Sequence, residues 1–328
     1  MRYRAFGRTD LQVSELGFGC GSVGGLLVRG TWREMVATVE RAIALGVNYF
    51  DTASLYGEGR SEVNLGAVLR ELGAEVLVGT KVRLTPAEMG HLHDAVLASA
   101  EASLKRLQMD CVDILHLHNP IHLHQDPDRS AVGLADLPPI VDAFQRLQAQ
   151  GKIRWYGING LGETAALHQA VATTGAHSIQ TCYNLLNPSA GQPVPPGFPF
   201  QDYRDLIAQS TQRGLGVIAI RVLAGGALSG TVHRHPTAAP TVSPIATSTD
   251  YAQDVAQAQR FRPLVEEGYV ASSVEAAIRF AISHAGVSTA LVGVSSLDQL
   301  EQAADAVEKG PLPVAALTRL ATLKDYTG

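Results

Sequence analysis

Cysteine and long apolar runs are both scarce in this chain. Its 328 residues include 3 cysteines, at Cys20, Cys111 and Cys182. Their odd number and wide spacing match neither a disulfide framework nor a metal-binding pattern, so we expect unpaired, mostly buried thiols in a reducing compartment. No stretch of about eighteen apolar residues is present to cross a bilayer, and the N-terminus lacks the apolar region of a secretion signal. These absences predict a cytoplasmic protein without a membrane partner.

Positive charge is also limited. Charged residues make up 17% of the chain, the net charge is -5, and the two signs are interspersed rather than grouped. Because no basic stripe is present, a nucleic-acid partner is not expected. A hydrophobic content of 46% in a chain of this length is enough to bury a large core. No segment has the composition of a linker, so we expect a single domain over residues 1–328.

Short apolar runs alternate with longer amphipathic segments along the whole chain. This alternation is typical of repeated βα units and a parallel sheet, and eight units in about 300 residues predict a (β/α)8 TIM barrel. Tyr3–Val13, with its G-R-T-D turn, is expected to form a β-hairpin that closes the barrel bottom. The strands are expected at Ser14–Cys20, Val47–Asp51, Val76–Val82, Cys111–His118, Ile153–Ile158, Ser178–Tyr183, Val217–Ile220 and Ala290–Val294.

Four residues with acid-base chemistry lie at or just beyond the ends of three of these strands. They are Asp51, Tyr56, Lys81 and His118, and the carboxyl ends of barrel strands form the catalytic face. A tyrosine can protonate a carbonyl oxygen if its pKa, about 10 in water, moves toward neutrality. A buried lysine cation favours the tyrosinate, an aspartate holds that cation, and a histidine can position the substrate oxygen. The four residues therefore predict proton transfer to or from a carbonyl or alcohol.

A plainer interpretation is an Asp-Lys pair that satisfies itself in the core, with the tyrosine and histidine as ordinary hydrogen-bonded residues. Burying a charged pair costs several kcal/mol of desolvation, roughly, before the two groups attract each other. Such a pair at the catalytic end of a barrel favours a functional role.

The motif G-x-G-x-x-G at Gly19–Gly24, with Asp51 at the end of the following strand, also fits a Rossmann dinucleotide-binding unit. In that unit the glycines open the helix directly. Here residues 26–30 intervene, and the better helix start is Thr31, which with Glu34 forms a capping-box pattern. The Rossmann interpretation is therefore the weaker one.

Four histidines in H-L-H-N-P-I-H-L-H, at His116, His118, His122 and His124, raise the alternative of a zinc hydrolase. On a strand, residues two apart face the same side, so His116 and His118 are expected inside the barrel. The other two lie in a loop and are expected to face solvent or substrate. No distant ligand completes a metal site, so no bound metal is expected.

Six motifs in order resemble the aldo-keto reductase superfamily. They cover almost the whole chain and carry all four residues above with their flanking sequence. They are F-G-R-T-D-L-Q-V-S-E-L-G-F-G from Phe6, F-D-T-A-S-L-Y-G-E-G-R-S-E from Phe50, G-T-K-V from Gly79, D-I-L-H-L-H from Asp113, G-K-I-R-W-Y-G-I from Gly151 and Q-T-C-Y-N-L-L from Gln180. The resemblance implies an NAD(P)-dependent oxidoreductase with Tyr56 as general acid or base.

The resemblance also implies a set of cofactor-binding residues, with several departures from the family pattern. Asn159-Gly160 stands where Ser-Asn is usual, Ile220 replaces a stacking aromatic residue, and Arg221 replaces a serine. We expect Arg221 to pair with the pyrophosphate. The expected contacts are Gly19, Cys20, Gly21, Asp51, Asn159, Gly160, Gln180, Arg221, Leu223, Gly225, Gly293, Ser295, Ser296 and Gln299.

The identity of the cofactor depends on one further departure. Gln299 occupies the place of the arginine that holds the 2'-phosphate in many relatives, and the adjacent Asp298 adds repulsion. No neighbouring cation in the sequence replaces that arginine. The resemblance therefore implies NADP(H) or NAD(H), with no fixed preference for NADP(H).

The substrate pocket is expected to be open, because the chain ends soon after its last helical segment. Its walls are expected from Trp32, Tyr56, His118 and the Asn119–Leu134 loop, and aldehydes, ketones and sugars are all compatible as substrates. Two Pro-rich segments, Pro188–Pro199 and Thr231–Asp250, are expected to be loops, and the second could lie across the cofactor. Potassium-channel beta subunits of this superfamily illustrate the alternative, a cofactor-binding regulatory or scaffold subunit. The oligomeric state stays open.

Overall fold

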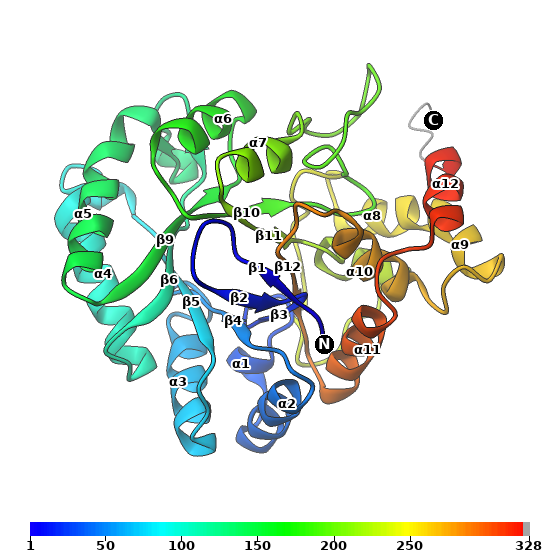
Figure 1. Cartoon of the computed structure of the whole chain (residues 1–328), viewed down its shortest axis with the longest axis horizontal. Coiled ribbons are helices and arrows are strands. Elements are labelled where there is room, and N and C mark those ends of the chain that lie inside the picture. The colour runs from blue at the N-terminus through cyan, green and yellow to red at the C-terminus, as the bar shows by residue number, and fades with distance from the viewer. Residues whose placement is uncertain (324–328) are drawn as a thin grey trace.

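The computed structural model describes residues 1–323, and the last five residues of the expected 1–328 domain lie outside it. Eight parallel strands form a closed barrel surrounded by helices (Figure 1), which confirms the predicted (β/α)8 class. Around the barrel the order is β10-β11-β12-β3-β4-β5-β6-β9. The strands are β3 (Leu16–Gly19), β4 (Tyr49–Asp51), β5 (Leu77–Val82), β6 (Val112–Leu117), β9 (Ile153–Gly160), β10 (Ser178–Cys182), β11 (Gly216–Ile220) and β12 (Thr289–Gly293).

Side chains point alternately into and out of the barrel along each strand, and the outward-pointing apolar side chains pack against the surrounding helices. On β6, Leu115 and Leu117 belong to the main core between the barrel and the helices, whereas Ile114 packs inside the barrel. The helices are α1 (Leu26–Arg29), α2 (Trp32–Ala44), α3 (Arg60–Leu72), α4 (Leu92–Leu107), α5 (Leu137–Ala149), α6 (Thr164–Thr173), α7 (Leu206–Gln212), α8 (Tyr251–Ala258), α9 (Pro263–Glu266), α10 (Ser273–Ser283), α11 (Leu297–Glu308) and α12 (Val314–Leu323).

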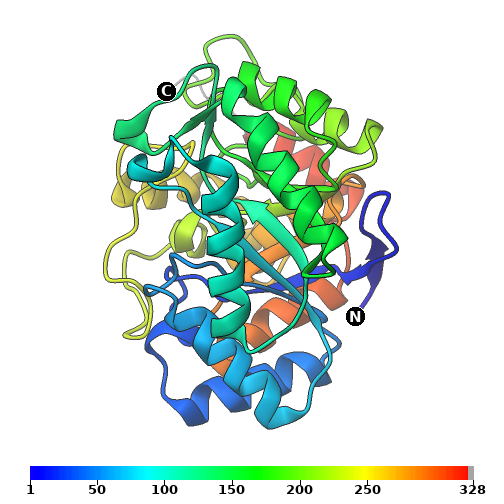
Figure 2. The ribbon, with the colours of Figure 1, turned by 90° about the vertical axis from the view of Figure 1, so that its left-hand side faces the viewer.

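The N-terminal hairpin closes one end of the barrel, as predicted. Strand β1 (Tyr3–Ala5) pairs antiparallel with β2 (Gln12–Ser14), so the hairpin extends one residue beyond its expected end. Apolar residues of the hairpin, led by Phe6, pack against Tyr49, Ile114 and Ile218 inside the barrel. Figure 2 shows this hairpin, in dark blue, on the side opposite the long yellow-green segment that follows β11. The opposite, carboxyl end of the strands is therefore left for the site.

Two expectations about local structure need correction. The stretch 26–30 after the glycine motif contains the short helix α1, so the glycines do open a helix, although a closed barrel rather than a Rossmann sheet surrounds them. Helix α2 begins as predicted, with Thr31 and Glu34 forming a capping box. The expected loop at 119–134 holds a small two-stranded sheet, because β7 (Ile121–His122) pairs with β8 (Val132–Gly133).

The two Pro-rich segments contain no helix or strand, as predicted. Residues 188–199 form turns and bends, and residues 231–250 connect the short helical turn at Ala224–Ser229 to α8. Asp250 then caps α8 by accepting a hydrogen bond from the Gln253 amide. Within residues 1–323, no helix is long and apolar enough to span a membrane.

Candidate active site

Asp51 and Lys81 form a buried ion pair inside the carboxyl end of the barrel. Strands β4 and β5 are neighbours, which places the two side chains together, and both are almost completely buried. The Lys81 ammonium contacts the Asp51 carboxylate and also donates a hydrogen bond to the Thr52 carbonyl at 2.7 Å. The pair is therefore held by both side-chain and backbone contacts.

Tyr56 lies directly above this pair and beside His118. The Lys81 ammonium donates to the Tyr56 hydroxyl at 3.3 Å, and it lies 4.8 Å from the centre of the Tyr56 ring. The rings of Tyr56 and His118 meet edge to face, with centres 5.7 Å apart. Tyr56 and His118 are only partly buried and line a cavity together with Asp51, whereas Lys81 does not line it. The structure therefore brings all four predicted residues together.

Asp51 has two further partners that the sequence did not predict. Its Oδ1 atom accepts hydrogen bonds from the Tyr49 hydroxyl at 3.0 Å and from the Gln180 side-chain amide at 2.6 Å. Tyr49 has room for its hydroxyl because residue 79 on the neighbouring strand is glycine. A Cβ atom at Gly79 would lie 2.4 Å from the Tyr49 hydroxyl oxygen. The Tyr49 contact follows from strand alternation, since residues two apart share a face. The Gln180 contact spans the barrel and has no local signal.

Burial and neighbouring charges together set the ionisation of the site, and they oppose each other at Lys81 but act in the same direction at the histidines. Burial disfavours the Lys81 cation, but Asp51 and Tyr56 more than offset this, so the pKa of Lys81 is raised above its usual value. Burial, aided by the Lys81 and Arg83 cations, holds the pKa of His118 well below its usual range. Burial and the same Lys81 charge lower the pKa of His116 to about 3. Both histidines are therefore neutral at neutral pH.

Buried neutral histidines should make the fold sensitive to acid. Below about pH 6.5 the His116 imidazole binds a proton in the unfolded chain, whereas in the folded protein it stays neutral down to about pH 3. The free energy of unfolding therefore decreases as the pH is lowered through this window. Replacing His116 by Asn should reduce the slope of unfolding free energy against pH, measured by urea unfolding between pH 7 and 5, by about 1 kcal/mol per pH unit on average. The same change at exposed His124 is the control, and equal slopes for wild type and His116→Asn would contradict this account.

Three of the four residues, Asp51, Tyr56 and His118, line a cavity of about 420 Å³ at the carboxyl end of the barrel. Most of the expected cofactor-binding residues line it. Those that do are Gly19, Gly21, Asp51, Asn159, Gln180, Arg221, Leu223, Gly225, Gly293, Ser295 and Gln299. Three others, Cys20, Gly160 and Ser296, are not among the lining residues. Cys20 is buried behind the wall, and Ser296 instead caps α11 through the Gln299 amide.

Arg221 gives the cavity an unneutralised positive charge. Its backbone adopts the left-handed conformation, with φ of 56°, and its carbonyl accepts a hydrogen bond from the Asn184 side chain at 2.9 Å. The guanidinium donates to the Ser243 carbonyl but forms no ion pair with a carboxylate of residues 1–323. Burial lowers the pKa of Arg221. A strained, partly buried cation lining a cavity fits an anionic ligand group such as a pyrophosphate.

The segment 231–250, here called the strap, crosses from β11 to the glycine loop. The Ala239 amide donates to the Val23 carbonyl at 3.0 Å. The Arg234 guanidinium donates to the carbonyls of Ala239 at 2.6 Å and Gly225 at 2.8 Å, and it lies over the Tyr251 ring. The strap therefore lies across the cavity, as the sequence suggested.

The strap brings basic side chains to the cavity that Gln299 also lines. They are His233, Arg234 and His235, more than sixty positions before Gln299 in sequence. Sequence neighbours alone could not show this, because the strap and Gln299 meet at one cavity only through the fold. The side-chain carbonyl oxygen of Gln299 accepts a hydrogen bond from the Ser295 backbone amide at 2.8 Å.

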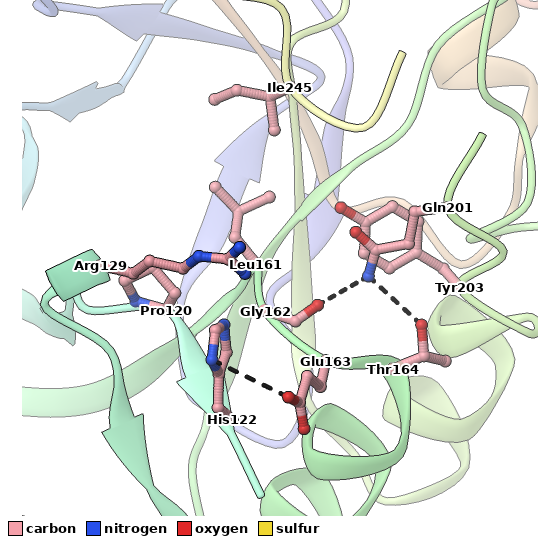
Figure 3. A pocket seen from close by; sticks show the side chains of 10 residues that line it. All are labelled: Pro120, His122, Arg129, Leu161, Gly162, Glu163, Thr164, Gln201, Tyr203 and Ile245. Carbon is pink, nitrogen blue, oxygen red and sulfur yellow. Dashed lines mark hydrogen bonds and ion pairs between the residues drawn. The ribbon is translucent and has the colours of Figure 1, made fainter. Parts of the chain in front are cut away.

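Two of the expected substrate-wall residues, Tyr56 and His118, line the cavity, whereas Trp32 does not. Pro120, His122 and Arg129 of the 119–134 segment line a second cavity, of about 510 Å³ (Figure 3), which shares Leu161 and Ile245 with the first. Trp32 begins α2 and keeps 46% of its surface exposed. His122, which was expected to face solvent or substrate, lies in the wall of the second cavity and is 8% exposed, because β7 and β8 pair beside it. Its Nδ1 atom lies 4.0 Å from carboxylates of Asp126 and Glu163.

The histidines of this region do not assemble a metal centre. His116 bonds to the Ser178 hydroxyl at 3.0 Å and faces the barrel interior, as predicted. In the part of the chain that the structure describes, no group of three or more His, Cys, Asp or Glu side chains is placed to hold a metal ion.

Comparison with known proteins agrees with this geometry. A model of the Aldo/keto reductase family matches residues 15–325. L-galactose dehydrogenase of Arabidopsis thaliana is 30% identical, over 98% of this chain and 89% of that protein. The putative voltage-gated potassium channel subunit beta of Schizosaccharomyces pombe is 28% identical, over 93% and 88%. The holo form of aldo-keto reductase AKR11C1 from Bacillus halodurans shares the fold, with a TM-score of 0.71 at 24% identity over 98% and 96% of the two chains.

The chain therefore belongs to the aldo/keto reductase family. Membership and relatives such as L-galactose dehydrogenase support an oxidoreductase, and the family implies a nicotinamide cofactor in general terms.

Proposed function

We propose that this protein is an NAD(P)-dependent oxidoreductase that interconverts a carbonyl compound and its alcohol, with Tyr56 as the general acid and base. The observation that carries the proposal is the Lys81 ammonium, which contacts both the buried Asp51 carboxylate and the Tyr56 hydroxyl. A cation in this position favours the tyrosinate. In the proposal, Lys81 stabilises the negative charge that develops on the Tyr56 oxygen as its proton passes to a substrate oxygen.

Each of the other residues has a distinct role in this proposal. When bound, the nicotinamide supplies or accepts the hydride. Asp51 holds the Lys81 cation, and the Tyr49 and Gln180 donors hold Asp51. His118 stays neutral, so its ring can form a hydrogen bond with the substrate oxygen without adding charge to the site. The neutral ring leaves Tyr56 as the only proton source of the pair.

The chain's own residues suit the cofactor at both ends of the cavity. Asn159 and Gln180 present side-chain amides near the four catalytic candidates, and Arg221 presents a guanidinium. Ser295 is fixed at the far wall, because its hydroxyl donates to the Gly24 carbonyl at 2.6 Å. Amides for a carboxamide and a cation for a pyrophosphate are the groups that a nicotinamide dinucleotide requires.

A regulatory or scaffold subunit is the second candidate, and the likeness to the Schizosaccharomyces pombe channel subunit favours it. Both candidates bind cofactor, so turnover separates them. We expect nicotinamide-dependent turnover on a panel of aldehydes, ketones and aldoses, assayed in both directions. Tight cofactor binding without turnover on any member would support the scaffold instead.

The altered 2'-phosphate region predicts a weak preference between the two cofactors. Because Gln299 carries no charge, titration of protein fluorescence should give dissociation constants for NADH and NADPH within about tenfold of each other, or about 1.4 kcal/mol. Gln299→Arg should tighten NADPH binding by about tenfold and leave NADH unchanged. Gln302→Arg, on the same helix and wall, controls for added charge. A preference for NADPH far above tenfold in wild type would contradict the prediction.

A further inference from the structure

A completely buried serine joins three segments at the carboxyl end of the barrel. Ser61 is the second residue of α3. Its hydroxyl donates to the Cys20 carbonyl at 2.8 Å, and its oxygen lies 2.8 Å from the Thr52 hydroxyl. Its backbone amide donates to the Tyr56 carbonyl at 3.1 Å. One residue therefore contacts the glycine motif after β3, the residue after β4, and Tyr56.

The direction of the two side-chain hydrogen bonds is fixed. A serine hydroxyl has one hydrogen, and that of Ser61 is donated to the Cys20 carbonyl. Thr52 must therefore be the donor to Ser61, so a chain of donors runs from Thr52 through Ser61 to Cys20. All three residues are almost completely buried, where a polar group that loses its partner costs free energy. The Thr52 side chain is thus held in one orientation.

Thr52 connects this chain of donors to Lys81. The three hydrogens of the Lys81 ammonium have three acceptors. They are the Asp51 carboxylate, the Thr52 carbonyl and the Tyr56 hydroxyl. The first two contacts leave the third hydrogen to point at Tyr56. Because the Thr52 amide also donates to a β5 carbonyl at 2.8 Å, the backbone and the side chain of Thr52 are both fixed.

The helix that carries Ser61 is itself anchored to the strand that carries Lys81. Glu62, the next residue, is completely buried. Its carboxylate accepts hydrogen bonds from the Thr80 hydroxyl at 2.5 Å and from the Arg106 guanidinium at 2.6 Å. Thr80 directly precedes Lys81 on β5. The start of α3 is therefore fixed to β5 as well as to the ends of β3 and β4.

We propose that Ser61 is a positioning residue for the contact between Lys81 and Tyr56. It holds the Thr52 carbonyl in the place where the Lys81 ammonium, also bound by Asp51, directs its third hydrogen at Tyr56. Without the Ser61 hydroxyl, the Thr52 side chain loses its acceptor and the Thr52 carbonyl can move. The Lys81 contact with Tyr56 then lengthens. The use of Tyr56 in turnover rests on the proposed function, but its position beside Lys81 does not.

Ser61→Ala tests this role through a quantity that does not require turnover. Tyrosinate is followed by ultraviolet absorbance, and subtracting the spectrum of the same protein with Tyr56→Phe isolates the signal of Tyr56. We expect the midpoint of this signal to lie about 0.5–1 pH unit higher in Ser61→Ala than in wild type, because a more distant cation stabilises the tyrosinate less. The midpoint of the pH profile of kcat for alcohol oxidation should move in the same direction.

Ser14→Ala is the matched control. The Ser14 hydroxyl is also completely buried, donates to the Leu16 carbonyl at 2.6 Å and accepts from the Asn48 amide at 3.1 Å, but it lies at the hairpin end of the barrel. Its loss should lower the melting temperature and leave both midpoints unchanged. Thr52→Val removes the other end of the donor chain and should raise the midpoints as well, so the test stands even if Ser61→Ala folds poorly.

The outcomes separate the positioning role from the proposed function. Equal tyrosinate midpoints for wild type, Ser61→Ala and Thr52→Val, with only the melting temperature lowered, would overturn the positioning role even in an active enzyme. A raised tyrosinate midpoint in a protein without turnover would support the positioning role and count against the oxidoreductase proposal.

Discussion

Replacing Tyr56 by Phe should lower kcat by about 10²- to 10⁴-fold, the usual contribution of a positioned acid or base. The variant keeps the ring that packs edge to face on His118 and loses only the hydroxyl that meets the Lys81 ammonium. The affinity for the nicotinamide cofactor should stay within a few-fold of wild type, since the ring still lines the cavity. Steady-state kinetics and fluorescence titration measure the two quantities.

A structural role for the tyrosine would give a different result. If the hydroxyl only completed the packing, Tyr56→Phe would lower stability and leave kcat near the wild-type value. Tyr251→Phe provides the control, because this hydroxyl also borders the cavity but lies on the strap side, away from the Asp51-Lys81 pair. It should change kcat by less than about threefold, since it has no part in proton transfer.

Replacing Lys81 by Met should destabilise the fold by about 3–5 kcal/mol and abolish most turnover. The change removes the cation and leaves the Asp51 carboxylate buried, with only Tyr49 and Gln180 as donors. An unpaired buried charge is the main reason for the large effect. Urea unfolding measures the loss of stability.

A double variant tests whether the loss of stability arises from the coupling between Asp51 and Lys81. Asp51→Asn combined with Lys81→Met should cost clearly less than the sum of the two single changes, since neither charge is then stranded. Lys152→Met is the control: its ion pair with Glu101, at 2.5 Å, lies on the surface and should contribute under about 1 kcal/mol. Additive single effects would contradict a coupled pair.

The barrel was predictable because its pattern is local. Each strand is a short apolar run whose position the sequence places within a few residues, as for β6 at Val112–Leu117 against the expected 111–118. The four catalytic candidates were predictable for the same reason, since they follow strand ends and barrel closure brings all strand ends to one face. Their joint position needed no knowledge of long-range packing.

The contacts made by loops were not predictable in this way. Arg234 reaches the cavity only because the strap folds back over Val23, more than two hundred positions away, and Gln180 reaches Asp51 across the barrel. Trp32 was placed in the substrate wall on its chemistry alone, whereas α2 directs it elsewhere. The walls of the second cavity come from the connections after β6, β9 and β10 together with the strap. No sequence pattern predicts that four such distant segments meet.

The most direct test of the central claim is transfer of deuterium from nicotinamide cofactor labelled at C4 to a carbonyl substrate, followed in a single turnover by mass spectrometry of the product. The wild-type protein should place deuterium on the former carbonyl carbon, and Tyr56→Phe should do so at least a hundredfold more slowly. Absence of transfer from wild type with bound cofactor, or equal rates for wild type and Tyr56→Phe, would contradict the account.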